Sequence, residues 1–125
     1  MSIIVKPRKV DKPWGFELVL AHTDRYVAKL LHINKGQRLS RQYHEIKDET
    51  LYVLAGTLIF QLGQGSEMQE FIVPAGQGFR ILPGMIHRFI APDDSDCDLI
   101  EASTPELDDV VRLEDVYGRE GTSEP

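Results

Sequence analysis

Apolar and polar residues alternate along several short stretches of the chain, which is the pattern of β-strands with one buried face. Residues 25–33 alternate most clearly, and the even-numbered positions from 26 to 32 form one side. Residues 16–20 alternate more weakly and are predicted to form an earlier strand. Residues 51–62 form a long apolar run that contains Gly56. A glycine there suits a bend between two strands better than the interior of a helix.

Further strands are predicted where short apolar stretches lie between glycine, proline, asparagine or aspartate residues. These stretches are residues 70–73, 79–82, 87–91 and 97–103. Many short strands at regular spacing predict an all-β antiparallel sandwich or barrel. One short helical segment is predicted near the C-terminus, around residues 107–116.

The chain has 125 residues, a length that supports one hydrophobic core, so a single domain over residues 1–125 is predicted. Residues 1–10 are basic and contain a proline, and we expect an extended arm. Residues 119–125 carry no large apolar side chain and are predicted to be a disordered tail. The apolar residues Ile3, Ile4 and Val5 suit a strand that pairs with a neighbouring subunit, which predicts a homodimer.

Composition narrows the classes of partner. Lysine and arginine together number 14 against 20 aspartates and glutamates, so the formal net charge is −6. Nucleic-acid binding needs a basic surface, and this balance argues against it. No apolar stretch approaches the length of a membrane-spanning helix, so no membrane partner is expected. The single Cys97 cannot form an internal disulfide and fits a reducing, cytoplasmic location.

The residues best suited to bind a metal ion or to take part in catalysis lie between Gly36 and Gly56. Gln42 and His44 are two positions apart, so on a strand their side chains leave the same face. Glu49 follows a short polar turn and begins the next apolar run. An amide, an imidazole and a carboxylate that converge in this way suit a divalent metal such as zinc, iron, manganese, cobalt or nickel.

These positions resemble the first motif of the cupin superfamily, with Gln42 in place of its first histidine. Gly76, Gly84 and His87 resemble the second motif. The resemblance extends to the cupin domain of type II mannose-6-phosphate isomerases, where it forms the C-terminal part of a bifunctional guanylyltransferase and isomerase. That likeness is carried by Lys-Pro-Trp-Gly-Phe-Glu at residues 12–17, Leu-Ser-Arg-Gln-Tyr-His at 39–44 and Val-Arg-Leu-Glu-Asp-Val-Tyr-Gly-Arg at 111–119.

The resemblance implies a double-stranded β-helix, the jelly-roll barrel of cupins, that holds one divalent metal ion. The implied metal ligands are Gln42, His44, Glu49 and His87. Zinc is the first choice of metal, with manganese, iron, cobalt and nickel as alternatives. The isomerases carry a glutamate in the strand that corresponds to residues 97–103, followed by a Val-Arg pair. The implied catalytic residues are therefore Glu101, as the base, and Arg112, as the cation for phosphate or enediolate charge.

The implied function is aldose–ketose isomerisation of a sugar phosphate, with mannose 6-phosphate as the leading substrate. The chain departs from the family at Glu45 and Ile46, which replace two of three consecutive histidines, and at Leu51, which replaces a tryptophan. These changes keep the predicted metal ligands but leave the sugar, and its phosphorylation, open. Two alternatives also stay open. One is a cupin of other chemistry, such as a dioxygenase or an epimerase-like sugar enzyme, and the other is a non-catalytic sugar-binding cupin.

Overall fold

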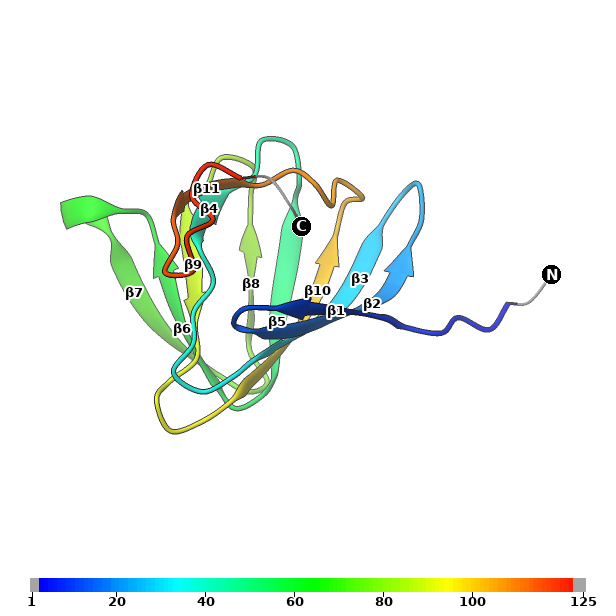
Figure 1. Cartoon of the computed structure of the whole chain (residues 1–125), viewed down its shortest axis with the longest axis horizontal. Helices are drawn as coiled ribbons and strands as arrows, with labels where there is room; N and C mark the ends of the chain where they lie inside the picture. Colours follow the sequence, from blue (N-terminus) through cyan, green and yellow to red (C-terminus); the bar gives the residue numbers. More distant parts are fainter. Residues whose placement is uncertain (1–2, 123–125) are drawn as a thin grey trace.

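The structure is a computed structural model that describes residues 3–122, and these residues form two antiparallel sheets that face each other (Figure 1). The six-stranded sheet contains, in spatial order, β1 (Arg8–Lys12), β2 (Gly15–His22), β3 (Val27–Ile33), β10 (Cys97–Ser103), β5 (Glu49–Ala55) and β8 (Gly78–Ile81). The five-stranded sheet contains β11 (Val111–Glu114), β4 (Arg41–Tyr43), β9 (His87–Ile90), β6 (Thr57–Leu62) and β7 (Gln69–Pro74). A single 3-10 turn, η1 (Gly65–Glu67), precedes β7. The predicted all-β barrel is confirmed.

The alternation seen in the sequence decides which side chains enter the core. In β3 the odd-numbered residues are buried and the even-numbered residues are half-buried. Strand β10 shows the same alternation, with Leu99 fully buried between the sheets. Together with Leu31, Leu51, Leu58 and Phe60 it forms a continuous apolar core. Because this core lies between the two sheets, polar residues at inward positions are held in a largely apolar environment.

Gly56 separates β5 from β6, as its position in the apolar run predicted. Its φ angle is +78°, in the left-handed region that favours glycine. A Cβ atom at this position would lie 2.2 Å from the carbonyl oxygen of Asp96. The chain can therefore pass sharply from one sheet to the other only because residue 56 has no side chain.

The predicted helix at residues 107–116 is wrong. Short turns cover residues 107–108, and Val111–Glu114 forms strand β11, which pairs with β4 in the five-stranded sheet. Leu107, Val110 and Val111 have a spacing that imitates one face of a helix, but the β-branched valines favour a strand once a partner edge is available. The free edge of β4 supplies that partner.

The N-terminal segment differs in part from a simple arm, because Arg8–Lys12 pairs with β2 along its whole length. Residues 3–7 are exposed and project from the barrel (Figure 1). Residues 1–2 of the predicted arm and 123–125 of the predicted tail lie outside the described residues. Within residues 3–122, no helix is long and apolar enough to span a membrane.

Candidate metal centre

Four predicted site residues come from three neighbouring segments inside the barrel. Gln42 lies on β4, and His44 directly follows that strand. Gln42 is paired with His87, the first residue of β9. Glu49 is the first residue of β5 in the opposite sheet. Ligand atoms of His44, Glu49 and His87 all lie within 4.8 Å of one another, and all three residues are buried.

Backbone carbonyl groups orient both imidazole rings. The Nδ1 atom of His44 lies 2.5 Å from the carbonyl oxygen of Asp109, and that of His87 lies 2.9 Å from the carbonyl oxygen of Met85. A carbonyl oxygen can only accept a hydrogen bond, so each neutral ring carries its proton on Nδ1. The free lone pair is then on Nε2. This atom lies 3.5 Å from the Glu49 carboxylate in His44 and 3.8 Å from it in His87.

Two nitrogen lone pairs and a carboxylate that face one another form a set of donors that a metal cation could bind. Burial lowers the pKa of His87 to about 4, so this ring is neutral at pH 7. Burial raises the pKa of Glu49, but His44, Lys47 and His87 outweigh that effect and hold it below its ordinary value. Both Nε2 atoms lack a hydrogen-bond partner among residues 3–122. A divalent metal that accepts imidazole and carboxylate ligands would satisfy all three groups.

Gln42, the fourth predicted ligand, lines a cavity together with His44 and Glu49. Its amide oxygen accepts a hydrogen bond of 2.6 Å from the hydroxyl group of Ser40. A carbonyl oxygen has two lone pairs, so one remains for a metal ion. In the sheet Gln42 is paired with His87 on one side and Arg112 on the other. Its role as a fourth ligand stays a prediction.

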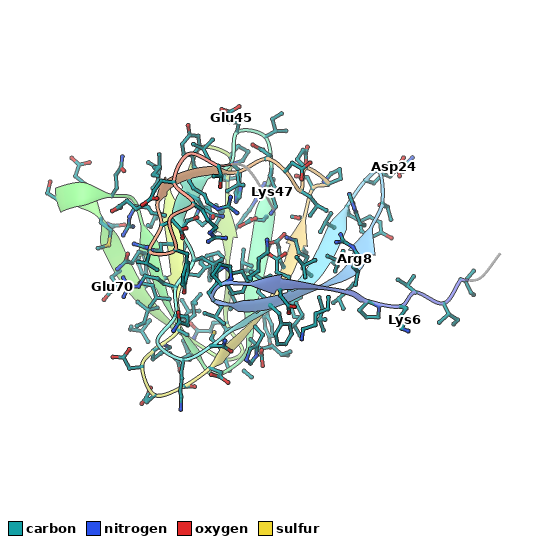
Figure 2. All side chains as sticks on the ribbon, viewed as in Figure 1. Lys6, Arg8, Asp24, Glu45, Lys47 and Glu70 are labelled. Carbon is teal, nitrogen blue, oxygen red and sulfur yellow. The ribbon has the colours of Figure 1, made fainter. Side chains whose placement is uncertain are left out.

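Lys47 links the cluster to the predicted catalytic carboxylate. Its Nζ atom lies 2.9 Å from Oε2 of Glu49 and 3.1 Å from Oε2 of Glu101. Burial lowers the pKa of Lys47, but the charges of Glu101 and Glu49 outweigh burial and raise it. The side chain therefore stays charged between two carboxylates. Figure 2 shows Lys47 within the barrel, whereas Glu45 of the same loop points away from it.

Asp109 was not found by reading the sequence. Its carboxylate accepts hydrogen bonds from the backbone N–H groups of three successive residues, Glu45, Ile46 and Lys47, at 2.7–3.0 Å. Burial raises the pKa of Asp109, but these three bonds outweigh it and lower the pKa. One residue thus fixes both the ring of His44, through its carbonyl group, and the loop that carries Lys47. The contacts join residues more than 60 positions apart, so no local pattern indicates them.

The two predicted catalytic residues line the same cavity as Gln42, His44 and Glu49. Glu101 is buried on β10, where the hydroxyl group of Ser103 donates a 3.0 Å hydrogen bond to its Oε2 atom. Arg112 is buried on β11 and donates a 2.8 Å hydrogen bond from Nη1 to Oγ1 of Thr122. The structure therefore brings the two residues together, although their catalytic roles stay untested.

Charged side chains in the cavity wall are mainly positive. Among residues 3–122, three carboxylates line it: Glu17, Glu49 and Glu101. Five cationic side chains from the same part of the chain line it: Lys12, Lys29, Lys47, Arg112 and Arg119. Lys29 and Glu17 form a buried ion pair of 3.2 Å, and Trp14 supplies a buried apolar wall. An excess of cations in a chain of net charge −6 makes the cavity suitable for an anionic ligand.

Comparison with known proteins identifies the family of the chain. Residues 2–115 match the family described as "Mannose-6-phosphate isomerase C-terminal". The xanthan biosynthesis protein XanB of Xanthomonas campestris pv. campestris is 32% identical over 115 residues, which cover 90% of this chain and 24% of that protein. The mannose-1-phosphate guanylyltransferase ManC of Salmonella typhimurium is 34% identical over 115 residues, covering 90% of this chain and 23% of that protein. The chain thus spans about a quarter of the length of these curated relatives.

Solved structures support the fold. The cupin-superfamily sugar phosphate isomerase of Silicibacter pomeroyi superposes with a TM-score of 0.66 and 20% identity, covering 78% of this chain and 64% of that one. The capsular polysaccharide assembling protein CapF of Staphylococcus aureus superposes with a TM-score of 0.77 and 19% identity, covering 90% of this chain and 33% of that one. At these identities the likeness concerns the double-stranded β-helix alone. By its sequence match, the chain belongs to the mannose-6-phosphate isomerase C-terminal family of cupins.

Proposed function

We propose that this protein is a metal-dependent aldose–ketose isomerase that interconverts mannose 6-phosphate and fructose 6-phosphate. The observation that carries the proposal is the cluster of His44, Glu49 and His87, joined through Lys47 to the buried carboxylate of Glu101. Family membership and the name of the relative ManC, a mannose-1-phosphate guanylyltransferase, support a sugar phosphate as the substrate.

His44, Glu49 and His87 would hold the metal, with Gln42 as the proposed fourth ligand. A divalent ion at this place supplies Lewis acidity toward the oxygens on carbons 1 and 2 of the sugar. Zinc is the proposed metal, because two imidazoles and a carboxylate form a common catalytic zinc set. Manganese, iron, cobalt and nickel remain alternatives that elemental analysis of the purified protein separates.

Glu101 is the proposed base. Lys47 and Ser103 both contact its Oε2 atom, so we assign proton transfer to Oε1. This oxygen takes the proton from carbon 2 of the aldose, and the electrons of that C–H bond form the double bond of an enediolate. The same proton returns to carbon 1, while the hydroxyl proton passes from O2 to O1, which completes the ketose. Arg112 stabilises the negative charge that develops on the sugar oxygens or the charge of the phosphate.

The remaining cations around the cavity fit a phosphorylated sugar. Lys12 and Arg119 lie near Arg112 in the wall, and burial is the largest of the influences that lower the pKa of Lys12. A phosphate group brings about two negative charges and several strong acceptors to such a set of donors. The phosphate therefore gains more from this wall than a neutral hydroxymethyl group of free mannose would.

The test is an isomerase assay on mannose 6-phosphate and on unphosphorylated mannose, with protein loaded with each candidate metal. We expect turnover of mannose 6-phosphate and none of unphosphorylated mannose. Glu101→Gln should lower kcat by at least about 100-fold, which is the usual effect of removing a general base. Binding of sugar phosphate without turnover under any metal would favour a non-catalytic sugar-binding cupin. Oxygen consumption by the iron-loaded protein would favour a dioxygenase.

The proposed working form is a homodimer in the cytoplasm. The compartment is proposed from the single Cys97, whose thiol is buried and whose pKa burial raises to about 12. Such a thiol is unreactive and forms no disulfide in a reducing environment.

A further inference from the structure

Two arginine side chains lie close together on the outer face of the five-stranded sheet. In β9, His87 and Phe89 point inward to the metal cluster and the core, so Arg88 between them points outward. Arg38 forms an antiparallel bridge with Ile90, which lies two positions from Arg88 and shares its face. Residues in this diagonal relationship lie roughly 7–8 Å apart, a distance that two arginine side chains can span.

Arg88 is buried although it lies on an outer face, with only 6% of its surface exposed. Its Nε atom donates a 2.8 Å hydrogen bond to the carbonyl oxygen of Leu39, which fixes the orientation of the guanidinium group. Its Nη2 atom is also buried and has no hydrogen-bond partner within residues 3–122. A buried donor without an acceptor costs free energy, so an acceptor bound at this atom would stabilise the protein.

Arg41, on the neighbouring strand β4, shows how an arginine on this face is satisfied. It is buried to a similar extent, and its guanidinium group donates to Glu114 at 2.6 Å, to Gln61 at 2.7 Å and to the carbonyl oxygen of Gly63 at 3.0 Å. Gln61 is also the direct sheet partner of Arg88, but its amide oxygen is used by Arg41. The protein thus supplies acceptors to one buried arginine and leaves a donor of the other unmatched.

The charges around Arg88 are mainly positive. Burial, and then the charges of Arg38 and Arg41, lower the pKa of Arg88. The carboxylates of Glu114 and Asp115 act in the opposite direction but are outweighed, and both already form ion pairs with other arginines. An anion placed between Arg38 and Arg88 would relieve this repulsion and would accept the unmatched hydrogen bond.

We propose that Arg38 and Arg88 bind a phosphate group on the outer face of the five-stranded sheet. The planar fork of N–H donors on arginine suits contact with two oxygens of one phosphate, and the bond to Leu39 holds one guanidinium group in place before the ligand arrives. Because Nη2 of Arg88 is covered, a neighbouring side chain has to shift to admit the ligand. The half-buried Arg38 is the side chain that we expect to move.

A small phosphorylated molecule, or free phosphate, suits this place better than an acidic protein partner. Glu70 is paired with Gln61, and Gln61 with Arg88, so the carboxylate of Glu70 lies on the same face (Figure 2). Glu114 lies beyond Arg41 on that face. These two carboxylates would repel an extended acidic surface, whereas a single phosphate brings about two negative charges to the arginines alone.

This site is separate from the metal centre and does not rest on the proposed isomerase function. It lies on the opposite face of β9 from His87. Among residues 3–122, those that line the cavity around Glu101 and Arg112 include neither Arg38 nor Arg88. A phosphate bound on the outer face therefore occupies a second position and leaves the cavity open to its own ligand.

The test is an NMR titration that follows the backbone amides of the full-length, metal-free protein. Inorganic phosphate is the probe in one arm and glycerol phosphate in the other, each compared with sodium chloride at equal ionic strength. We expect saturable shifts at residues 38–40 and 87–89 and at the Nε–H group of Arg88. Tighter binding of glycerol phosphate would identify an esterified ligand, and tighter binding of inorganic phosphate would identify the free ion. Shifts around Arg112 report binding in the cavity separately.

Arg88→Gln and Arg38→Gln should each weaken phosphate binding at this site by at least about tenfold, since each removes a charge-assisted contact. Arg25→Gln is the matched control, because that exposed arginine lies between β2 and β3 and its loss changes the net charge equally. It should bind phosphate as the wild type does. Circular dichroism checks the fold of each variant, and Arg38→Gln decides the outcome if Arg88→Gln does not fold.

Three results would overturn the proposal. The first is the absence of saturable shifts at residues 38–40 and 87–89, or shifts there that sodium chloride produces equally. The second is unchanged phosphate binding in folded Arg38→Gln protein. The third is equal weakening in the arginine variants and in Arg25→Gln, which would show an effect of overall charge rather than a site.

Discussion

The carbonyl oxygen of Asp109 lies 2.5 Å from Nδ1 of His44, while the carboxylate of the same aspartate accepts three backbone hydrogen bonds from the loop that carries Lys47. Asp109 follows β10 in the chain and His44 follows β4, so the contact ties two loops together at one end of the barrel. Partners of this kind hold a metal-binding histidine in one tautomer and one orientation, and they affect metal affinity without touching the metal.

The first prediction concerns this contact. Asp109→Asn keeps the backbone carbonyl group but weakens the hold of the carboxylate on the loop, because an amide offers one acceptor oxygen in place of two. We expect metal affinity to fall by about 10–100-fold, as measured by competition with a chromophoric chelator. Asp108→Asn is the matched control, since that neighbouring aspartate is exposed, and it should bind metal as the wild type does. Equal affinities for the two variants would contradict a positioning role for Asp109.

The second prediction concerns the ligands themselves. His44→Ala should lose most bound metal but remain folded, because the apolar core between the sheets does not depend on the ion. Glu49→Gln should bind metal more weakly, since it removes the carboxylate charge, whereas Gln42→His should keep the metal. The measurement is metal per chain by elemental analysis, with circular dichroism to check folding. The exposed His22, changed to alanine, serves as the control histidine. Full metal occupancy in folded His44→Ala protein would reject the site.

Most of the fold was predictable because the physics of the strands is local. Alternation in residues 25–33 and 97–103 reports directly which side chains face the core, and β3 and β10 form there. Gly56 indicated the bend because glycine, unlike other residues, adopts a positive φ angle without steric cost. By contrast, β1 and β11 are short strands whose existence depends on a partner edge supplied by distant residues. The local pattern contains no information about that partner, so the spacing of apolar residues around 107–116 predicts a helix where β11 forms.

The site residues likewise divide into those that local sequence patterns indicate and those that depend on contacts between distant residues. His44 and Glu49 lie five positions apart, and a motif with fixed spacing can place them on neighbouring elements. His87 could be added because the resemblance supplied a second motif. The bridge from Lys47 to Glu101 and the hold of Asp109 on residues 45–47 depend on how loops fold over the barrel end. No alternation or spacing along the chain encodes those contacts.

The third prediction is a pH dependence of the metal-free protein. The folded-state pKa of His87 is about 4, below its unfolded value of about 6.5. As pH falls between these values, the unfolded chain binds a proton that the folded chain does not. The free energy of unfolding should therefore decrease with falling pH, by up to roughly 1.4 kcal/mol per pH unit from this group. Stability is fully present above pH 6.5 and is lost toward pH 4.

Urea denaturation of chelator-treated protein at several pH values measures this effect. His87→Gln removes the titrating ring and should flatten the curve between pH 6.5 and 5, where the carboxylates with lowered pKa, such as Asp109 and Asp115, still contribute little. A wild-type curve that is already flat in that range would contradict a neutral, buried His87.

The last prediction tests Lys47 as the cation between two buried carboxylates. Lys47→Met leaves Glu49 and Glu101 without their shared partner, and uncompensated buried charge costs about 3–5 kcal/mol in comparable sites. We expect a fall of that size in the free energy of unfolding of the metal-free protein. Lys47→Arg keeps the positive charge and is the matched control, with a smaller loss that reflects packing alone. Since a bound divalent ion supplies positive charge at Glu49, adding zinc should restore more stability to Lys47→Met than to Lys47→Arg. Equal stability of the two variants, with and without zinc, would show that Lys47 does not neutralise this pair.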